Sequence, residues 1–106
     1  FSISLSKGPV TFTLTGTRFY HVIQSIGFAA EEALGLGELG SLGWAFFYNH
    51  DATNYVELRS GTGAGNDIIK IMAGEFALFR FGSDITAPYA VANTGAVLLE
   101  YVILEN

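Results

Sequence analysis

Hydrophobic and polar residues alternate strictly at the start of the chain. Over residues 1–6 an aromatic or aliphatic side chain alternates with serine, and over residues 10–15 it alternates with threonine. Since successive side chains of a strand point to opposite faces, both segments are predicted to be half-buried strands with a hydroxyl-bearing outer face. Gly8-Pro9 is the predicted turn between them. A third run, residues 18–26, continues the period of two and is predicted to be a strand.

In later runs, both the odd-numbered and the even-numbered positions are apolar, so both faces of the predicted strands are apolar. Lys70, Arg80 and Glu100 are the only charged residues within them; the runs are residues 44–48, 68–72, 76–81 and 96–104. An antiparallel sheet with one face in water shows clean alternation instead. We therefore expect both faces of these strands to be covered, by a second sheet on one side and by a neighbouring subunit on the other. The last two-thirds of the chain should supply the core and the contacts.

Only residues 29–34 (AAEEAL) have a helix-forming composition. An isolated helix of that length is marginal, so this segment is predicted to be a strand or a single turn, followed by a glycine-rich flexible loop. The fold class that follows is all-β. We predict a single domain over residues 1–106, an antiparallel two-sheet β-sandwich of the jelly-roll kind with about nine to ten short strands.

Composition adds a reason to expect partners. The chain has 106 residues, of which 14% are charged, whereas about 25% is usual in soluble domains. A small domain has a large surface relative to its volume, and this chain has too few charged side chains to cover it. We expect serine, threonine, glycine and asparagine to cover part of the surface and other subunits to cover the rest.

Charge and residue content exclude several classes of function. The net charge is −5 and the five basic residues are scattered, which argues against binding a nucleic-acid backbone. The absence of cysteine excludes disulfides, thiolate metal sites and cysteine nucleophiles. No apolar run approaches the ~20 residues of a membrane-spanning helix, so no membrane partner is expected.

No segment carries a recognisable catalytic or metal-binding pattern. His21 and His50 are the only histidines and are far apart in sequence, so no metal site is predicted. No serine lies in a nucleophile motif and no carboxylate pair has a spacing that suggests hydrolysis. We expect no enzyme activity, no catalytic residues and no cofactor. A pocket that grouped His50, Asp51 and a further carboxylate would reopen the enzyme hypothesis.

Two polar loops have alternative interpretations. The glycine-rich residues 61–67 resemble a phosphate-binding loop, but a strand and not a helix is predicted to follow, which favours a flexible hairpin connection. Asn49, Asp51 and Asn54, together with Asn66 and Asp67, offer oxygen ligands for calcium. The same residue types stabilise turns by bonding to their own backbone, and this interpretation is favoured.

Exposed aromatic and aliphatic side chains are the candidate site. Trp44, Phe46 and Tyr48 share one strand face, which could stack on sugar rings but more often belongs to a core or an interface. We predict an interface made by seven residues: Trp44, Phe46, Tyr48, Phe79, Phe81, Leu98 and Val102.

Three segments resemble small uncharacterised virion proteins of tailed bacteriophages. They are residues 31–61 (EEALGLGELGSLGWAFFYNHDATNYVELRSG), 72–81 (MAGEFALFRF) and 86–106 (TAPYAVANTGAVLLEYVILEN), whereas residues 1–30 are more generic. The group shares a GW segment that runs into DATNYVE, a strand that begins GE and ends near an arginine, and a PYA-x-AN turn. The resemblance implies a structural subunit associated with the capsid or the tail.

The resemblance and the residues together give ranked expectations. The first is a capsid decoration or cement subunit on the outer surface of the head, bound to the major capsid protein or another virion protein. It should also bind itself, as a homo-oligomer for which the resemblance favours a trimer. The second is a neck, tail or fibre subunit, and the third is a carbohydrate-binding jelly-roll module that uses Trp44 and Tyr48.

Overall fold

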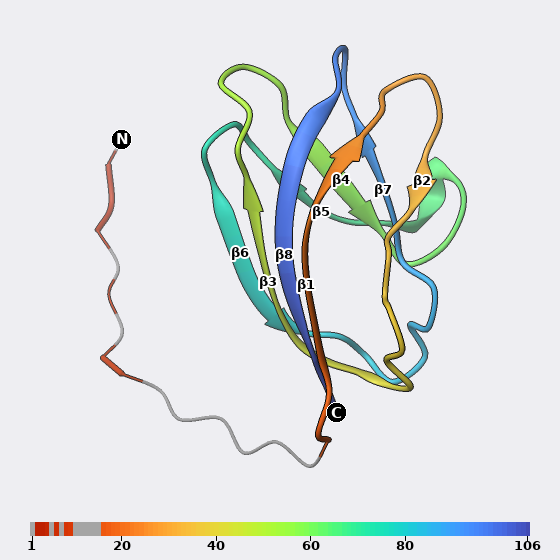
Figure 1. Ribbon diagram of the computed structural model, residues 1–106. Coiled ribbons are helices and arrows are strands. Elements are labelled where there is room, and N and C mark those ends of the chain that lie inside the picture. The colour runs from red at the N-terminus through yellow and green to blue at the C-terminus, as the bar shows by residue number, and fades with distance from the viewer. Residues whose placement is uncertain (1, 5, 7, 10–15) are drawn as a thin grey trace.

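The structure is a computed structural model that describes residues 2–4, 6, 8–9 and 16–106. Within these residues, no α-helix occurs, and no helix is long and apolar enough to cross a membrane. One 3₁₀ turn, η1 (Ala64–Asn66), connects two of the strands (Figure 1). The strands are β1 (Phe19–Ile26), β2 (Glu32–Ala33), β3 (Leu42–Asn49), β4 (Val56–Arg59), β5 (Asp67–Ile71), β6 (Phe76–Arg80), β7 (Tyr89–Ala92) and β8 (Val97–Glu105).

The eight strands form two four-stranded antiparallel sheets. The first sheet has the order β1-β8-β3-β6 and the second has the order β2-β7-β4-β5. Strand β1 therefore pairs with β8 and β2 with β7, so that each sheet joins the two ends of the described fold (Figure 1). Eight strands in this order make the double Greek key of a jelly roll. The predicted all-β, two-sheet sandwich is confirmed.

At the N-terminus, the described part of the first predicted strand differs from the prediction. The predicted strand at 18–26 is present as β1, and the segment 29–34 contains the two-residue strand β2. Residues 2–4 and 6, which belong to the first predicted strand, lie in no strand of the structure. The second predicted strand, residues 10–15, falls outside the described residues. The described residues thus contain eight strands, four in each sheet.

The core lies between the two sheets. It is built from every second residue of the strands whose two faces are both apolar. In β8 these are Val97, Leu99, Tyr101 and Ile103, all of which are buried. Phe47 of β3 is fully buried at the centre of an aromatic cluster; its ring centroid lies 5.2 Å from that of Tyr101, 5.7 Å from Phe79 and 6.2 Å from Phe81. The second sheet therefore covers one face of these strands, as predicted.

The position of Phe47 leads to a prediction about stability. Replacing Phe47 with Ala removes a ring that packs on three others, and should lower the free energy of unfolding by about 3–5 kcal/mol. Phe28, about half exposed in the loop between β1 and β2, is the matched control; Phe28→Ala should cost less than ~1 kcal/mol. Urea unfolding followed by tryptophan fluorescence measures both. Equal losses for the two variants would contradict this account of the core.

Candidate functional site

The outward side of the first sheet is the surface that the second sheet leaves uncovered. Cross-strand pairing places side chains from all four strands in rows across it; one row is His21, Val102, Phe46 and Leu78, and the next is Ile23, Glu100, Tyr48 and Phe76. We call this surface the outer face. Its residues are Phe19, His21 and Ile23 of β1, Leu98, Glu100, Val102 and Leu104 of β8, Trp44, Phe46 and Tyr48 of β3, and Phe76, Leu78 and Arg80 of β6.

Large apolar side chains on the outer face are unusually exposed. The exposed fraction lies between 37% and 68% for six of them: Phe19, Ile23, Phe46, Phe76, Leu78 and Leu98. On the second sheet, the buried Val56 and Leu58 of β4 point inward. Glu57 and Arg59 alternate with them, and Lys70 is paired with Glu57, so these three residues supply charge to the outward side of that sheet. Isolated exposed apolar residues are ordinary, but a contiguous apolar patch marks an interaction surface. The apolar exposure is therefore concentrated on one side of the sandwich.

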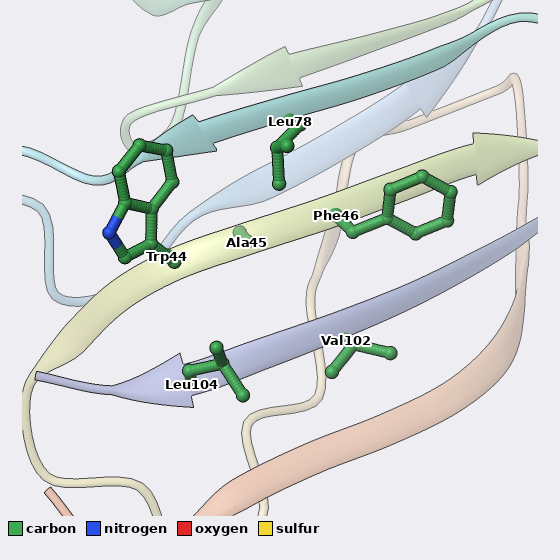
Figure 2. A pocket seen from close by; sticks show the side chains of 6 residues that line it. All are labelled: Trp44, Ala45, Phe46, Leu78, Val102 and Leu104. Atoms are coloured by element: carbon green, nitrogen blue, oxygen red, sulfur yellow. The ribbon is translucent and has the colours of Figure 1, made fainter. Parts of the chain in front are cut away.

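A small hollow lies in the outer face between β6, β3 and β8. Its volume is about 60 Å³, and Figure 2 shows the indole of Trp44 at one end of it with Leu78, Phe46 and Val102 around it. The guanidinium carbon of Arg80 lies 5.2 Å from the centroid of the Trp44 ring. Pockets for small-molecule ligands usually have ≈ 300–1,000 Å³. The hollow has room for part of an apolar side chain from a partner and is too small for such a ligand.

Three polar side chains meet at the centre of the outer face. Nε2 of His21 lies 2.7 Å from Oε2 of Glu100, and Nε2 of His50 lies 2.7 Å from Oε1 of the same carboxylate. His50 follows β3 directly; its backbone N–H donates to the carbonyl of Leu98, and its ring centroid lies 4.4 Å from that of Tyr48. Each carboxylate oxygen is thus bonded to a different histidine, one from either side of β8.

The two histidines stabilise the ionised form of the central carboxylate. The hydrogen bond from His21, and then that from His50, lowers the pKa of Glu100 below its usual value of 4.5. The histidines are 79 and 50 positions away from Glu100 in the sequence, so no local pattern revealed the cluster. Its only signal was that Glu100 is the single charge in the last apolar run. Nowhere in the described residues do three or more histidine, cysteine or acidic side chains form a group suited to a metal ion.

The structure separates the seven predicted interface residues into two groups. Five lie together on the outer face: Trp44, Phe46, Tyr48, Leu98 and Val102. Phe79 has the opposite parity in β6 and stacks on the buried Phe47, while Phe81, just beyond the strand, is itself buried in the core. Phe79 and Phe81 therefore do not belong to the exposed surface, and their assignment to it is corrected. The contact role of the other five stays a prediction.

The polar loop after β3 is organised by hydrogen bonds within itself. The fully buried side chain of Asn49 donates to the carbonyls of Asn54 and Ile71, and its Oδ1 accepts the N–H of Asp51. Oδ2 of Asp51 accepts the N–H groups of Asn54 and Thr53, at 2.6 and 3.0 Å, and these hydrogen bonds lower the pKa of Asp51. These oxygens serve the turn, which supports the turn interpretation over a calcium site.

The glycine-rich loop at residues 61–67 is also engaged with the protein. It contains the 3₁₀ turn η1 and leads into strand β5, in agreement with the strand predicted to follow it. The carboxylate of Glu31 accepts the N–H of Gly63 at 2.9 and 3.0 Å, and Arg59 contacts both Glu31 and Asp67. A carboxylate thus lies where a phosphate-binding loop would hold its anion, so a phosphate site is disfavoured. The side chain of His50 contacts Glu100, while Oδ2 of Asp51 accepts from the backbone of its own loop, and the expectation of no enzyme activity stays a prediction.

The central cluster leads to a prediction about titration. The pKa of Glu100 should lie below its ordinary value, and it should rise towards that value when His21 and His50 are both replaced by alanine. Because the folded-state pKa is depressed, the contribution of Glu100 to stability is present above its unfolded-state pKa and is lost as the pH falls through the folded-state pKa. A carbon-detected NMR titration of the side-chain carboxyls measures this. An unchanged Glu100 pKa in the double variant would contradict the geometry.

Known proteins offer no guide to the function of this arrangement. Comparison with protein-family models, with curated proteins and with solved structures gave no match to the chain. The resemblance of residues 31–61, 72–81 and 86–106 to bacteriophage virion proteins therefore stays a prediction. The function has to be argued from the residues of the outer face and of the loops around it.

Proposed function

We propose that the chain is a non-enzymatic structural subunit of a bacteriophage virion, most consistent with a capsid decoration or cement subunit. In this proposal it binds and stabilises the head shell and uses its outer face as a contact surface, with other copies of itself, the major capsid protein or another virion protein as the partner that covers this face. The observation that carries the proposal is the concentration of six exposed large apolar side chains on one side of the sandwich. The three resembling segments supply the virion context.

The size of the apolar patch supports a docking role. An aromatic side chain can bury roughly 150–250 Å², and the aliphatic ones are somewhat smaller, so these six side chains, about half exposed on average, present roughly 600 Å² together. The largest patch on an ordinary monomer is ≈ 300–600 Å², and a stable interface takes ≈ 800 Å² from each partner. With the partly buried Trp44, Val102 and Leu104 between them, the outer face approaches the area that one partner contributes.

The chemistry of the other polar groups agrees with a structural role. The loops that might have held calcium or phosphate use their polar atoms to stabilise turns and to join the β2 and β4–β5 segments. A sugar-binding role for Trp44 and Tyr48 is less favoured, because Arg80 lies over the Trp44 ring and His50 packs against Tyr48. A neck, tail or fibre position would use the same outer face and differs only in the partner.

Cryo-electron microscopy of particles from the phage that encodes the chain tests its position. We expect density for an eight-stranded sandwich on the outside of the head, with the outer face turned towards neighbouring protein. Density confined to the neck, tail or fibres would replace the decoration role with the second one. A complete particle without this chain would contradict a virion role altogether.

A binding experiment tests the use of the outer face. Leu78→Asp places a charge on the outer face at edge strand β6, and should reduce binding of the purified protein to particles that lack it by at least about tenfold. Ile68→Asp is the matched control, since Ile68 is an exposed apolar residue on edge strand β5 of the other sheet. Co-sedimentation with particles measures binding. Equal losses for the two variants would show that the outer face is not the docking surface.

A further inference from the structure

We propose that the outer face is covered by a second copy of this chain, and that the cluster of His21, Glu100 and His50 makes this contact sensitive to pH. The inference rests on the proposed docking role of the outer face and is independent of the place of the chain on a virion. It names the occupant of the face, which the docking role alone leaves open. Three features of the face select a second copy.

The first feature is charge. The whole chain carries a net charge of −5, so two copies repel each other over most of their surfaces. Of the ten acidic residues, only Glu100 lies on the outer face, and Arg80 balances it there. Copies that meet through this face bring together surfaces with no net charge, while nine carboxylates stay elsewhere. A strongly charged partner would find no complementary charge on it.

The second feature is that Glu100, the one carboxylate on the outer face, already accepts hydrogen bonds from groups of its own chain. A buried carboxylate without donors is costly, and this cost usually keeps such groups out of interfaces. Here both oxygens of Glu100 already have a histidine at 2.7 Å, so the carboxylate needs no donor from a partner. Apolar side chains surround the cluster, among them Ile23, Leu98 and Phe76. The face can therefore be covered by another apolar surface that brings no matching polar group.

The third feature is area. Each copy contributes roughly 600 Å² of exposed apolar surface, so two copies would bury about 1,200 Å² in all. This total is at the lower end of the area that stable interfaces bury. The hollow beside Trp44 and Leu78 offers space for an apolar side chain of the neighbour. A face of this kind serves a dimer, or the trimer that the resemblance implies, without any additional partner.

The pH dependence follows from the groups that face the centre. They are His21 from β1, Glu100 from β8, Tyr48 and His50 from β3 and its following residue, and Arg80 from β6 at the edge. With both histidines neutral, Glu100 and Arg80 cancel. When both histidines are protonated and Glu100 remains ionised, each copy carries a charge of +2 on the face. Copies should then repel each other, so protonation of the histidines at lower pH should weaken self-association.

Sedimentation velocity over micromolar concentrations tests the occupant. At pH 7.5 we expect the purified chain to form a dimer or trimer, Leu78→Asp to be monomeric, and Ile68→Asp to behave as the original chain. A chain that is monomeric up to about 100 μM would overturn the inference. The docking role would still stand if that monomer bound particles and Leu78→Asp did not, so the two proposals fail separately.

Repeating the experiment at pH 5.5 tests the cluster. We expect the dissociation constant to rise about tenfold or more between pH 7.5 and 5.5. A variant with both His21→Gln and His50→Gln keeps amide donors near Glu100 but cannot take up protons, and should lose this dependence. Circular dichroism at both pH values shows whether each protein is folded. An equal pH response in the double variant would place the cluster outside the interface and overturn the proposed pH sensitivity.

Discussion

Strand β8 is the element on which both the fold and the proposed contact depend, because it lies between β1 and β3 in the first sheet and is apolar on both sides. Its inward residues, Val97, Leu99, Tyr101 and Ile103, are buried against the second sheet. Its outward residues, Leu98, Glu100, Val102 and Leu104, form the middle of the outer face. A change of one residue in the register of β8 would exchange these two sets, and would place the carboxylate of Glu100 in the core. The burial of the core residues therefore fixes which side chains are presented outward.

The jelly-roll topology gives the outer face its polar centre. Antiparallel pairing brings β1, from the beginning of the described sandwich, and β3, from its middle, to either side of β8 (Figure 1). His21 and His50 thereby reach the same carboxylate from opposite sides. The buried Asn49 holds the end of β3 through bonds to Asn54 and Ile71, and the next residue is His50. The same topology that closes the core thus assembles a compact cluster within an otherwise apolar surface.

Much of the fold could be predicted from the sequence, because the period of two and the runs that are apolar at both parities reflect burial directly. The pattern also showed that Trp44, Phe46 and Tyr48 share one face of their strand, and the structure turns that face outward. Phe79 and Phe81 were misplaced because a run such as 76–81 is apolar at both parities, so the pattern alone does not say which parity faces the second sheet. The cluster of His21, Glu100 and His50 could not be predicted from the sequence, because it depends on pairing between residues that are 50 and 79 positions apart. Long-range register of this kind leaves no trace in a single local pattern.

The central claim is that protein covers the outer face when the chain is in its functional state. The chain has no cysteine, so a Leu98→Cys variant carries a single thiol at an exposed position of that face, and Ile68→Cys carries one on the other sheet. The rate of maleimide labelling measures whether each thiol is covered. The account predicts that the Leu98→Cys thiol becomes protected as the protein concentration rises, while the Ile68→Cys thiol stays reactive throughout. Labelling of Leu98→Cys that is equally fast at every concentration, and equally fast in assembled particles, would contradict it.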